Sequence, residues 1–262
     1  MSDFVCEKCR DSGMAPGNFF DPAIGAVIDC PGCWSRRVSG RAVVKANIFA
    51  RYTEATFEDF DRNKEFLNQE EVVSKCFAYA EDWDKVKAGG LCLSILGLKP
   101  GMGKSHLASA ICHKLIVERW KQSVADQDVC LFVNVNTWFG DWSRLYLSHP
   151  GEERYSDPEF LDRQKVLGQR ESRMCTTELL VLDDVSKFDR ERKKLEKLYG
   201  VIEHRVSHGL PIVVTENADS WGEVAERLGP EFGPVIVDRL CRSGDTVVIK
   251  VPLVRRGKKV AP

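Results

Sequence analysis

Short apolar runs alternate with longer amphipathic stretches along most of this chain. Five runs are mainly apolar, as is typical of strands buried on both faces of a sheet: residues 91–96, 129–135, 179–182, 211–215 and 246–251. Four longer stretches carry apolar side chains at helical spacing: residues 67–87, 105–116, 187–204 and 219–242. Residues 137–178 predict a short amphipathic helix, a polar loop and a second helix. This alternation predicts an α/β domain with a five-stranded parallel sheet and helices on both faces.

A glycine-rich segment joins the first apolar run to the helical pattern that follows it. Residues 100–106 read Pro-Gly-Met-Gly-Lys-Ser-His. In such a strand–loop–helix unit, backbone N–H groups surround a β-phosphate, the lysine reaches the β and γ oxygens, and the serine hydroxyl ligates Mg²⁺. The spacing departs from the usual one, because Leu98 stands where the first glycine is expected and Gly97 lies one residue earlier. The expected contacts with ATP are Pro100, Gly101, Met102, Gly103, Lys104, Ser105 and His106.

Polar side chains follow two of the apolar runs. Asp183 and Asp184 end the run at 179–182, and Asn217 comes shortly after the run at 211–215. Ligands in open α/β sheets bind at the carboxyl ends of the strands. We expect Asp183 to hold Mg²⁺ together with Ser105, and Asp184 to orient or deprotonate the water that attacks ATP. Asn217 is the candidate to hold this water or to sense the γ-phosphate.

Four of the ten cysteines form two close pairs near the N-terminus: Cys6, Cys9, Cys30 and Cys33. Four thiolates at this spacing predict a tetrahedral zinc site, with two disulfides or an iron–sulfur cluster as alternatives. A catalytic zinc usually has a histidine or carboxylate ligand, and no histidine precedes His106, so a structural role is expected. A segment of about 35 residues with this little apolar content needs the metal in order to fold.

The composition fits one domain and a small N-terminal unit. The chain has 262 residues, 43% of them apolar, and a net charge of −1, so nucleic-acid contact would need local basic patches. We assign residues 1–47 to a zinc-binding domain with a basic linker, and residues 48–262 to an ATPase domain. The short stretch after residue 251 predicts no large C-terminal helical lid. The scattered remaining cysteines and the lack of a signal peptide or apolar span predict a cytoplasmic protein without membrane contact.

Two further segments are rich in charged or aromatic side chains. The basic stretch 187–204 reads as a helix with a solvated charged face and Leu195, Leu198, Val201 and Ile202 packed inward. Trp138, Trp142 and Tyr146 belong either to the core or to a surface on which bases stack.

Taken together, these motifs resemble the replicative helicase loaders of the DnaC type and the related IstB transposition ATPases, both of the AAA+ class. The resemblance covers residues 48–256. Residues 51–60 (Arg-Tyr-x-x-Ala-Thr-Phe-Glu-Asp-Phe), here called the lead-in, are the most discriminating part. The other matching segments are residues 100–108, 179–184, 214–217 and 237–240.

The resemblance implies an ATPase that delivers a hexameric helicase to DNA during replication initiation. The N-terminal domain would grip the helicase, and the ATPase domain would bind single-stranded DNA and self-associate. Arg239 lies where the family places its arginine finger, with Arg242 as a competitor, and Arg255 lies near the second phosphate-sensing arginine. Leu98 and Asp184 depart from the usual residues and suggest slow hydrolysis, which DNA would stimulate. Such a protein would belong to a bacterial cell, with a phage gene as one source.

Two further functions stay open at the sequence level. One is an IstB-like helper ATPase that assembles on duplex DNA during transposition. The other is a zinc adapter that binds ATP as a conformational switch without hydrolysing it. The paired cysteines favour the loader, since the usual IstB chain begins without them.

Overall fold

The computed structural model describes residues 18–21, 26–29, 42–62, 67–121, 128–149, 151–242 and 244–250. Five residues of the sequence analysis lie outside the described residues: Cys6, Cys9, Cys30, Cys33 and Arg255. The zinc site and the second phosphate-sensing arginine therefore stay predictions. Among the described helices, none is long and apolar enough to cross a membrane.

The main body is built on a five-stranded sheet in which all neighbouring strands are parallel. Its strands are β3 (Cys92–Leu96), β4 (Cys130–Asn134), β5 (Leu179–Asp183), β6 (Ile212–Glu216) and β7 (Gly244–Val248). Their order across the sheet is β4-β5-β6-β3-β7. The predicted parallel sheet is thus confirmed, and β3, which leads into the glycine-rich loop, lies between β6 and β7.

Strand β7 begins two residues before the predicted apolar run. Gly244 pairs with Cys92 and Asp245 with Leu93, so two poor strand formers are included. A Cβ atom at Gly244 would lie 1.9 Å from the carbonyl oxygen of Cys92. The approach of the two backbones therefore requires glycine at this position, and pairing with a neighbour overrides the weak local propensity.

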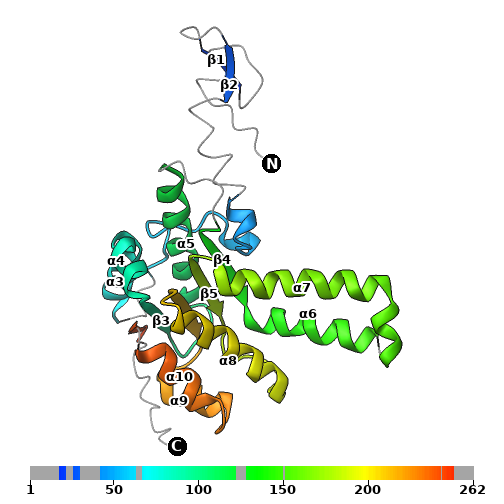
Figure 1. Cartoon of the computed structure of the whole chain (residues 1–262). Coiled ribbons are helices and arrows are strands. Elements are labelled where there is room, and N and C mark those ends of the chain that lie inside the picture. The colour runs from blue at the N-terminus through cyan, green and yellow to red at the C-terminus, as the bar shows by residue number, and fades with distance from the viewer. Residues whose placement is uncertain are drawn as a thin grey trace, which may run out of the picture.

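Helices cover both faces of the sheet, as predicted (Figure 1). One face carries α3 (Gln69–Glu81), α4 (Trp83–Gly89) and α5 (Lys104–Lys121). The other carries α8 (Arg192–Ser207), α9 (Trp221–Leu228) and α10 (Gly233–Arg242). Strand residues alternate between the two cores: Leu179 and Val181 belong to the first, Leu180 and Leu182 to the second.

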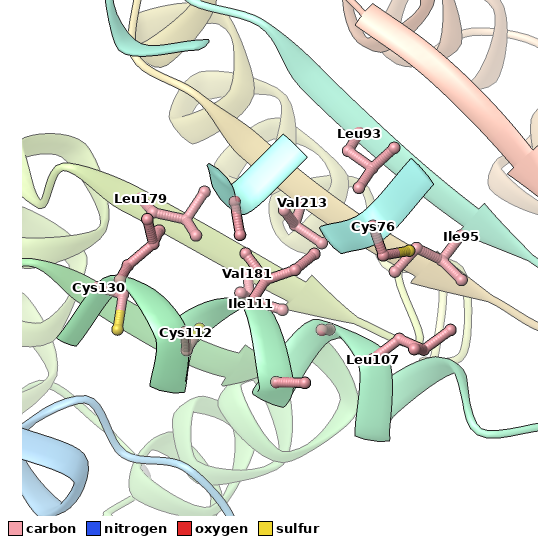
Figure 2. Close-up of a cluster of buried hydrophobic side chains, with 14 of the residues drawn as sticks. Cys76, Leu93, Ile95, Leu107, Ile111, Cys112, Cys130, Leu179, Val181 and Val213 are labelled. Atoms are coloured by element: carbon pink, nitrogen blue, oxygen red, sulfur yellow. The ribbon is translucent and has the colours of Figure 1, made fainter. Parts of the chain in front are cut away.

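The first core joins the helix after the glycine-rich loop to the middle of the sheet. Figure 2 shows Leu107 and Ile111 of α5 against Val181 and Val213 of the central strands, with Ile95 of β3 beside them. All these side chains are at most 2% exposed. This packing fixes the start of α5 relative to the strand ends, where the polar side chains gather.

Two helices form an arm that extends beyond the sheet (Figure 1). They are α6 (Val135–Ser148) and α7 (Pro158–Thr176), joined through η2 (Glu152–Ser156). Asn134 caps the N-terminus of α6. Asp157 caps the N-terminus of α7, whose first residue is a proline. The predicted helix, loop and helix are confirmed, although Val135 begins α6 instead of ending the strand.

Two other helices differ from the pattern. The expected helix at 67–87 is broken at Asp82 into α3 and α4, and the break lets Trp83 and Val86 reach the core that Cys76 and Ala80 already occupy. Gly90 ends α4 in the left-handed conformation, which glycine adopts readily. Helix α8 starts at residue 192 and not at 187, because residues 184–191 form the loop that leaves β5.

The N-terminal part contributes a hairpin and an edge of the main core. Strands β1 (Asn18–Asp21) and β2 (Ala26–Asp29) pair in antiparallel fashion. Val43 and Ala46 are buried in the first core, and the carbonyl of Ala46 accepts a 2.7 Å hydrogen bond from the N–H of Phe132 in β4. The packing of the main unit therefore includes residues that precede position 48.

Candidate nucleotide-binding site

The glycine-rich loop runs from the end of β3 to the start of α5. Gly101 and Gly103 adopt φ values of +80° and +82°, which side chains disfavour. A Cβ atom at Gly103 would also lie 2.3 Å from the Phe60 ring of the lead-in. Met102 turns its side chain inward, where Sδ accepts a 3.1 Å hydrogen bond from the N–H of Lys99. Met102 can therefore offer a ligand only its backbone, while Gly101 and the neighbouring Pro100 are exposed.

Lys104 lies inside this loop. Its Nζ donates to the carbonyls of Gly97 at 3.0 Å and Lys99 at 2.9 Å, and the residue is only 6% exposed. Burial lowers the pKa of Lys104, while the charges of Asp184 and Glu216 act in the opposite direction. The positive charge of Lys104 thus lies within the loop that the sequence predicts to bind phosphate.

Asp183 connects the loop to the neighbouring strands. Its Oδ1 accepts a 2.6 Å hydrogen bond from the Ser105 hydroxyl and another of 2.6 Å from Thr215 Oγ1. Its Oδ2 accepts from Asn134 Nδ2 at 3.2 Å. The predicted pair of Ser105 and Asp183 is therefore in contact, and the hydroxyl and carboxylate are ligands that Mg²⁺ prefers.

Thr215 and Asn134 are site residues that the sequence analysis missed. Both lie at the carboxyl ends of strands that border β5, and Asn134 is paired with Asp183 in the sheet register. A polar residue that ends an apolar run beside the acidic strand would have been the signal for each.

Asp184 has an unusual backbone and two side-chain partners. Its φ is +56°, and its N–H donates to Thr215 Oγ1 at 3.2 Å. Oδ1 accepts from Asn217 Nδ2 at 2.8 Å, and Oδ2 lies 3.4 Å from Lys187 Nζ. Burial, followed by the charge of Asp183, raises the pKa of Asp184. The expected approach of Asn217 to the acidic pair is present.

His106 is engaged by the lead-in. Its Nε2 is 2.7 Å from the carbonyl oxygen of Thr56, and its ring lies edge-on to those of Tyr52 and Phe60. Together with the contact between Phe60 and Gly103, this packing places the lead-in over the start of α5. The structure thus gives the motif at 51–60 a physical role as support for the loop.

The predicted arginine fingers lie on α10. Arg239 Nε donates to Glu203 Oε2 of α8 at 2.5 Å, and Arg239 Nη1 is 3.7 Å from Asp238. Arg242 is paired with Asp238 at 2.7 Å, and its side chain is 71% exposed. Both arginines thus form ion pairs with α8 or with their own helix.

The aromatic and basic segments separate into core and surface. Trp138 is fully buried and stacked on Phe139, so it belongs to the core and cannot stack on a base. Trp142 and Tyr146 are half-buried on the arm, 4.6 Å apart between ring centres. Several basic side chains of α8 pair with carboxylates: the exposed Arg192 with Glu196 and Glu231, the half-buried Lys197 with Glu171, and the buried Lys194 with Asp189 and Glu191. The segment is therefore a solvated face only in part.

Known structures share this fold, although sequence comparison finds nothing: no family model and no curated protein matches the chain. The DnaC helicase loader superposes with a TM-score of 0.55 at 19% identity, over 77% of this chain and 100% of the loader. DnaI gives 0.55 at 17% identity, over 75% of this chain and 92% of its own. The replication initiator DnaA, bound to AMPPCP and single-stranded DNA, gives 0.51 at 15% identity, over 78% of this chain and 51% of the initiator. The chain therefore has the fold that the DnaC helicase loader, DnaI and DnaA share.

Proposed function

We propose that this protein is an ATP-dependent loader that binds a replicative hexameric helicase and single-stranded DNA and delivers the helicase to DNA. The observation that carries the ATPase part is the meeting of five side chains at one edge of the sheet: Lys104, Ser105, Asp183, Asp184 and Asn217. They come from α5, β5 and the end of β6, so only the folded chain brings them together.

Each of these side chains has a chemical role in the proposal. Lys104 binds the β and γ phosphate oxygens, and Ser105 with Asp183 holds Mg²⁺. When bound, Mg²⁺ neutralises charge on the phosphates. Asp184 orients the nucleophilic water or takes up its proton, and burial favours this by raising the pKa of Asp184. Asn217 keeps the Asp184 carboxylate in place through their hydrogen bond.

The loader part is supported by the fold and by the lead-in. DnaC and DnaI share the fold over three quarters of this chain, and the lead-in packs on the loop through Phe60 and Thr56. By the same likeness, Arg239 acts as an arginine finger in a neighbouring subunit. Trp142 and Tyr146, with Lys197 5.9 Å from the Trp142 ring and Arg154 over the Tyr146 ring, supply the contact for single-stranded DNA.

The N-terminal segment completes the proposal. Cys6, Cys9, Cys30 and Cys33 bind a structural zinc ion, and the zinc-bound unit grips the helicase. Hairpin β1–β2 lies between the two cysteine pairs in the sequence, and β2 ends directly before Cys30. A short hairpin between two cysteine pairs supports a small unit that is held together by metal.

Two measurements test the function. Steady-state ATPase should be slow and rise with single-stranded DNA, and Lys104→Ala should abolish both nucleotide binding and turnover. The full chain should also co-purify with the replicative helicase of its host, and more strongly with ATP than without. Duplex-dependent ATPase without helicase binding would favour the transposition helper, and ATP binding without turnover would favour the adapter.

A further inference from the structure

A third carboxylate lies beside the acidic pair. Glu216 ends β6, between Thr215 and Asn217, and is only 1% exposed. Its Oε2 accepts a 2.6 Å hydrogen bond from the N–H of Ser186, and its Oε1 accepts one of 2.7 Å from the N–H of Asn217. Burying a charge this deeply costs free energy unless the charge is hydrogen-bonded or paired. The groups that Glu216 contacts therefore indicate its role.

The contacts of Glu216 end on the segments that carry the proposed catalytic groups. Ser186 lies two residues after Asp184, in the loop that leaves β5, and Asn217 donates its side chain to Asp184. The main-chain carbonyl of Glu216 also accepts a 3.2 Å hydrogen bond from the N–H of Gly97, at the start of the glycine-rich loop. Glu216 thus connects the glycine-rich loop, the loop of Asp184 and the backbone of Asn217.

The backbone of Asp184 explains why such a connection is needed. Its φ of +56° is uncommon for a residue with a side chain and has to be maintained by its surroundings. The N–H of Asp184 is held by Thr215, and the N–H of Ser186 is held by Glu216. The end of β6 therefore supports this turn on both sides of Val185.

Arg227 of α9 supplies the counter-charge. Its Nη1 lies 3.4 Å from Glu216 Oε1 and donates to the carbonyl of Asn217 at 2.7 Å. The guanidinium is also paired with Glu223 on the same helix, and its side chain is 37% exposed. Glu216 is thus joined, through Arg227, to a helix that reaches the surface.

We propose that Glu216 is a positioning residue for ATP hydrolysis, which holds Asp184 and Asn217 in their working arrangement and has Arg227 as its counter-charge. This inference rests on the proposed ATPase function. It differs from a purely structural role, because it assigns Glu216 to the turnover step and leaves nucleotide binding to Lys104 and Ser105.

Glu216→Gln is the sharpest test, since a glutamine amide keeps the shape but turns an N–H donor toward one of the two backbone N–H groups. We expect kcat to fall by about tenfold or more, while the dissociation constant of a fluorescent ATP analogue changes by less than about threefold. Glu223→Gln is the matched control: it removes the same charge from another partner of Arg227 without contact to the loop of Asp184, and it should leave kcat unchanged.

Arg227→Met is a second test, because it removes the counter-charge of Glu216 at a partly exposed position. It should lower kcat to a smaller extent at unchanged nucleotide affinity, and it decides the question if Glu216→Gln does not fold. The inference is overturned if the kcat of Glu216→Gln equals that of Glu223→Gln. If Glu216→Gln does not fold, the same comparison is made with Arg227→Met. A variant that loses only nucleotide affinity, with kcat unchanged, would overturn the inference as well. If the unsubstituted protein hydrolyses no ATP under any condition, the proposed function fails first and this role fails with it.

Discussion

Asn217 donates a 2.8 Å hydrogen bond from Nδ2 to Oδ1 of Asp184, although 33 residues separate them in the chain. The bond joins the ends of two neighbouring strands, β5 and β6, while Oδ2 of Asp184 lies 3.4 Å from Lys187 Nζ. A carboxylate held in this way on one oxygen can orient a water molecule with the other. The relationship therefore leads to a direct test of the proposed hydrolysis.

Asp184→Asn should keep nucleotide binding and abolish hydrolysis, because the amide cannot take up a proton from water. Asn217→Ala should lower kcat by about 10- to 100-fold, since the carboxylate stays but is no longer held. Phosphate release measures turnover, and a fluorescent ATP analogue measures binding on the same samples. An Asp184→Asn protein that turns over ATP at the unmodified rate would contradict this assignment.

Ser105→Ala should weaken ATP binding only when Mg²⁺ is present, since its hydroxyl, 2.6 Å from Asp183, is a proposed magnesium ligand. The measurement is the dissociation constant of ATP with Mg²⁺ and with EDTA. Ser109→Ala is the matched control, because that hydroxyl lies one turn further along α5 and donates to the main-chain carbonyl of Ser105 at 2.8 Å. Equal effects of the two substitutions would speak against the magnesium role.

Arg239→Ala should bind ATP normally and hydrolyse it poorly, because a finger in trans completes the site of the neighbouring subunit. Mixing Arg239→Ala with Lys104→Ala protein should restore part of the activity, and turnover per subunit should rise with protein concentration. The ion pair of Arg239 with Glu203 has to open for this role, so Glu203→Gln should not lower activity. If Arg242→Ala shows the loss and the rescue instead, Arg242 is the finger.

The full-length protein, purified under reducing conditions, should contain about one zinc ion per chain, bound by Cys6, Cys9, Cys30 and Cys33. Elemental analysis gives the content, and Cys30→Ser should reduce it strongly. Helicase binding should fall with the zinc content, while ATP affinity stays the same, because the nucleotide site uses other residues. A metal-free protein that binds the helicase fully would refute both the site and its role.

Arg205→Met should lower the free energy of unfolding by about 2–5 kcal/mol, because a buried hydrogen-bonding centre is lost. Arg205 is fully buried and donates to four backbone carbonyls, those of Met174, Thr177, Glu178 and Pro211. Urea denaturation measures the loss. Arg192→Met on the exposed face of the same helix should leave stability nearly unchanged, and a similar result for Arg205 would show that these bonds contribute little.

The sequence by itself predicted the succession of strands and helices along the chain, and most residues of the candidate nucleotide site. Runs such as residues 179–182 are apolar on both faces, and only a covered parallel sheet satisfies them. The glycine-rich loop and the acidic pair could be placed because their chemistry depends on local spacing. Ser105, Asp183, Asp184 and Asn217 meet as predicted, since the carboxyl ends of parallel strands share one edge.

Tertiary structure alone decided which polar groups are buried and what they contact. Arg205 and Arg192 belong to one charged helix, yet the first is at 0% exposure and the second is at the surface. Glu216 bonds to Ser186 in the loop after β5, and Asn134 to Asp183 at the end of β5, and both partners are distant in the chain. The break at Asp82 follows from packing as well. Burial and hydrogen bonding of this kind depend on neighbours far apart in sequence, so no local pattern encodes them.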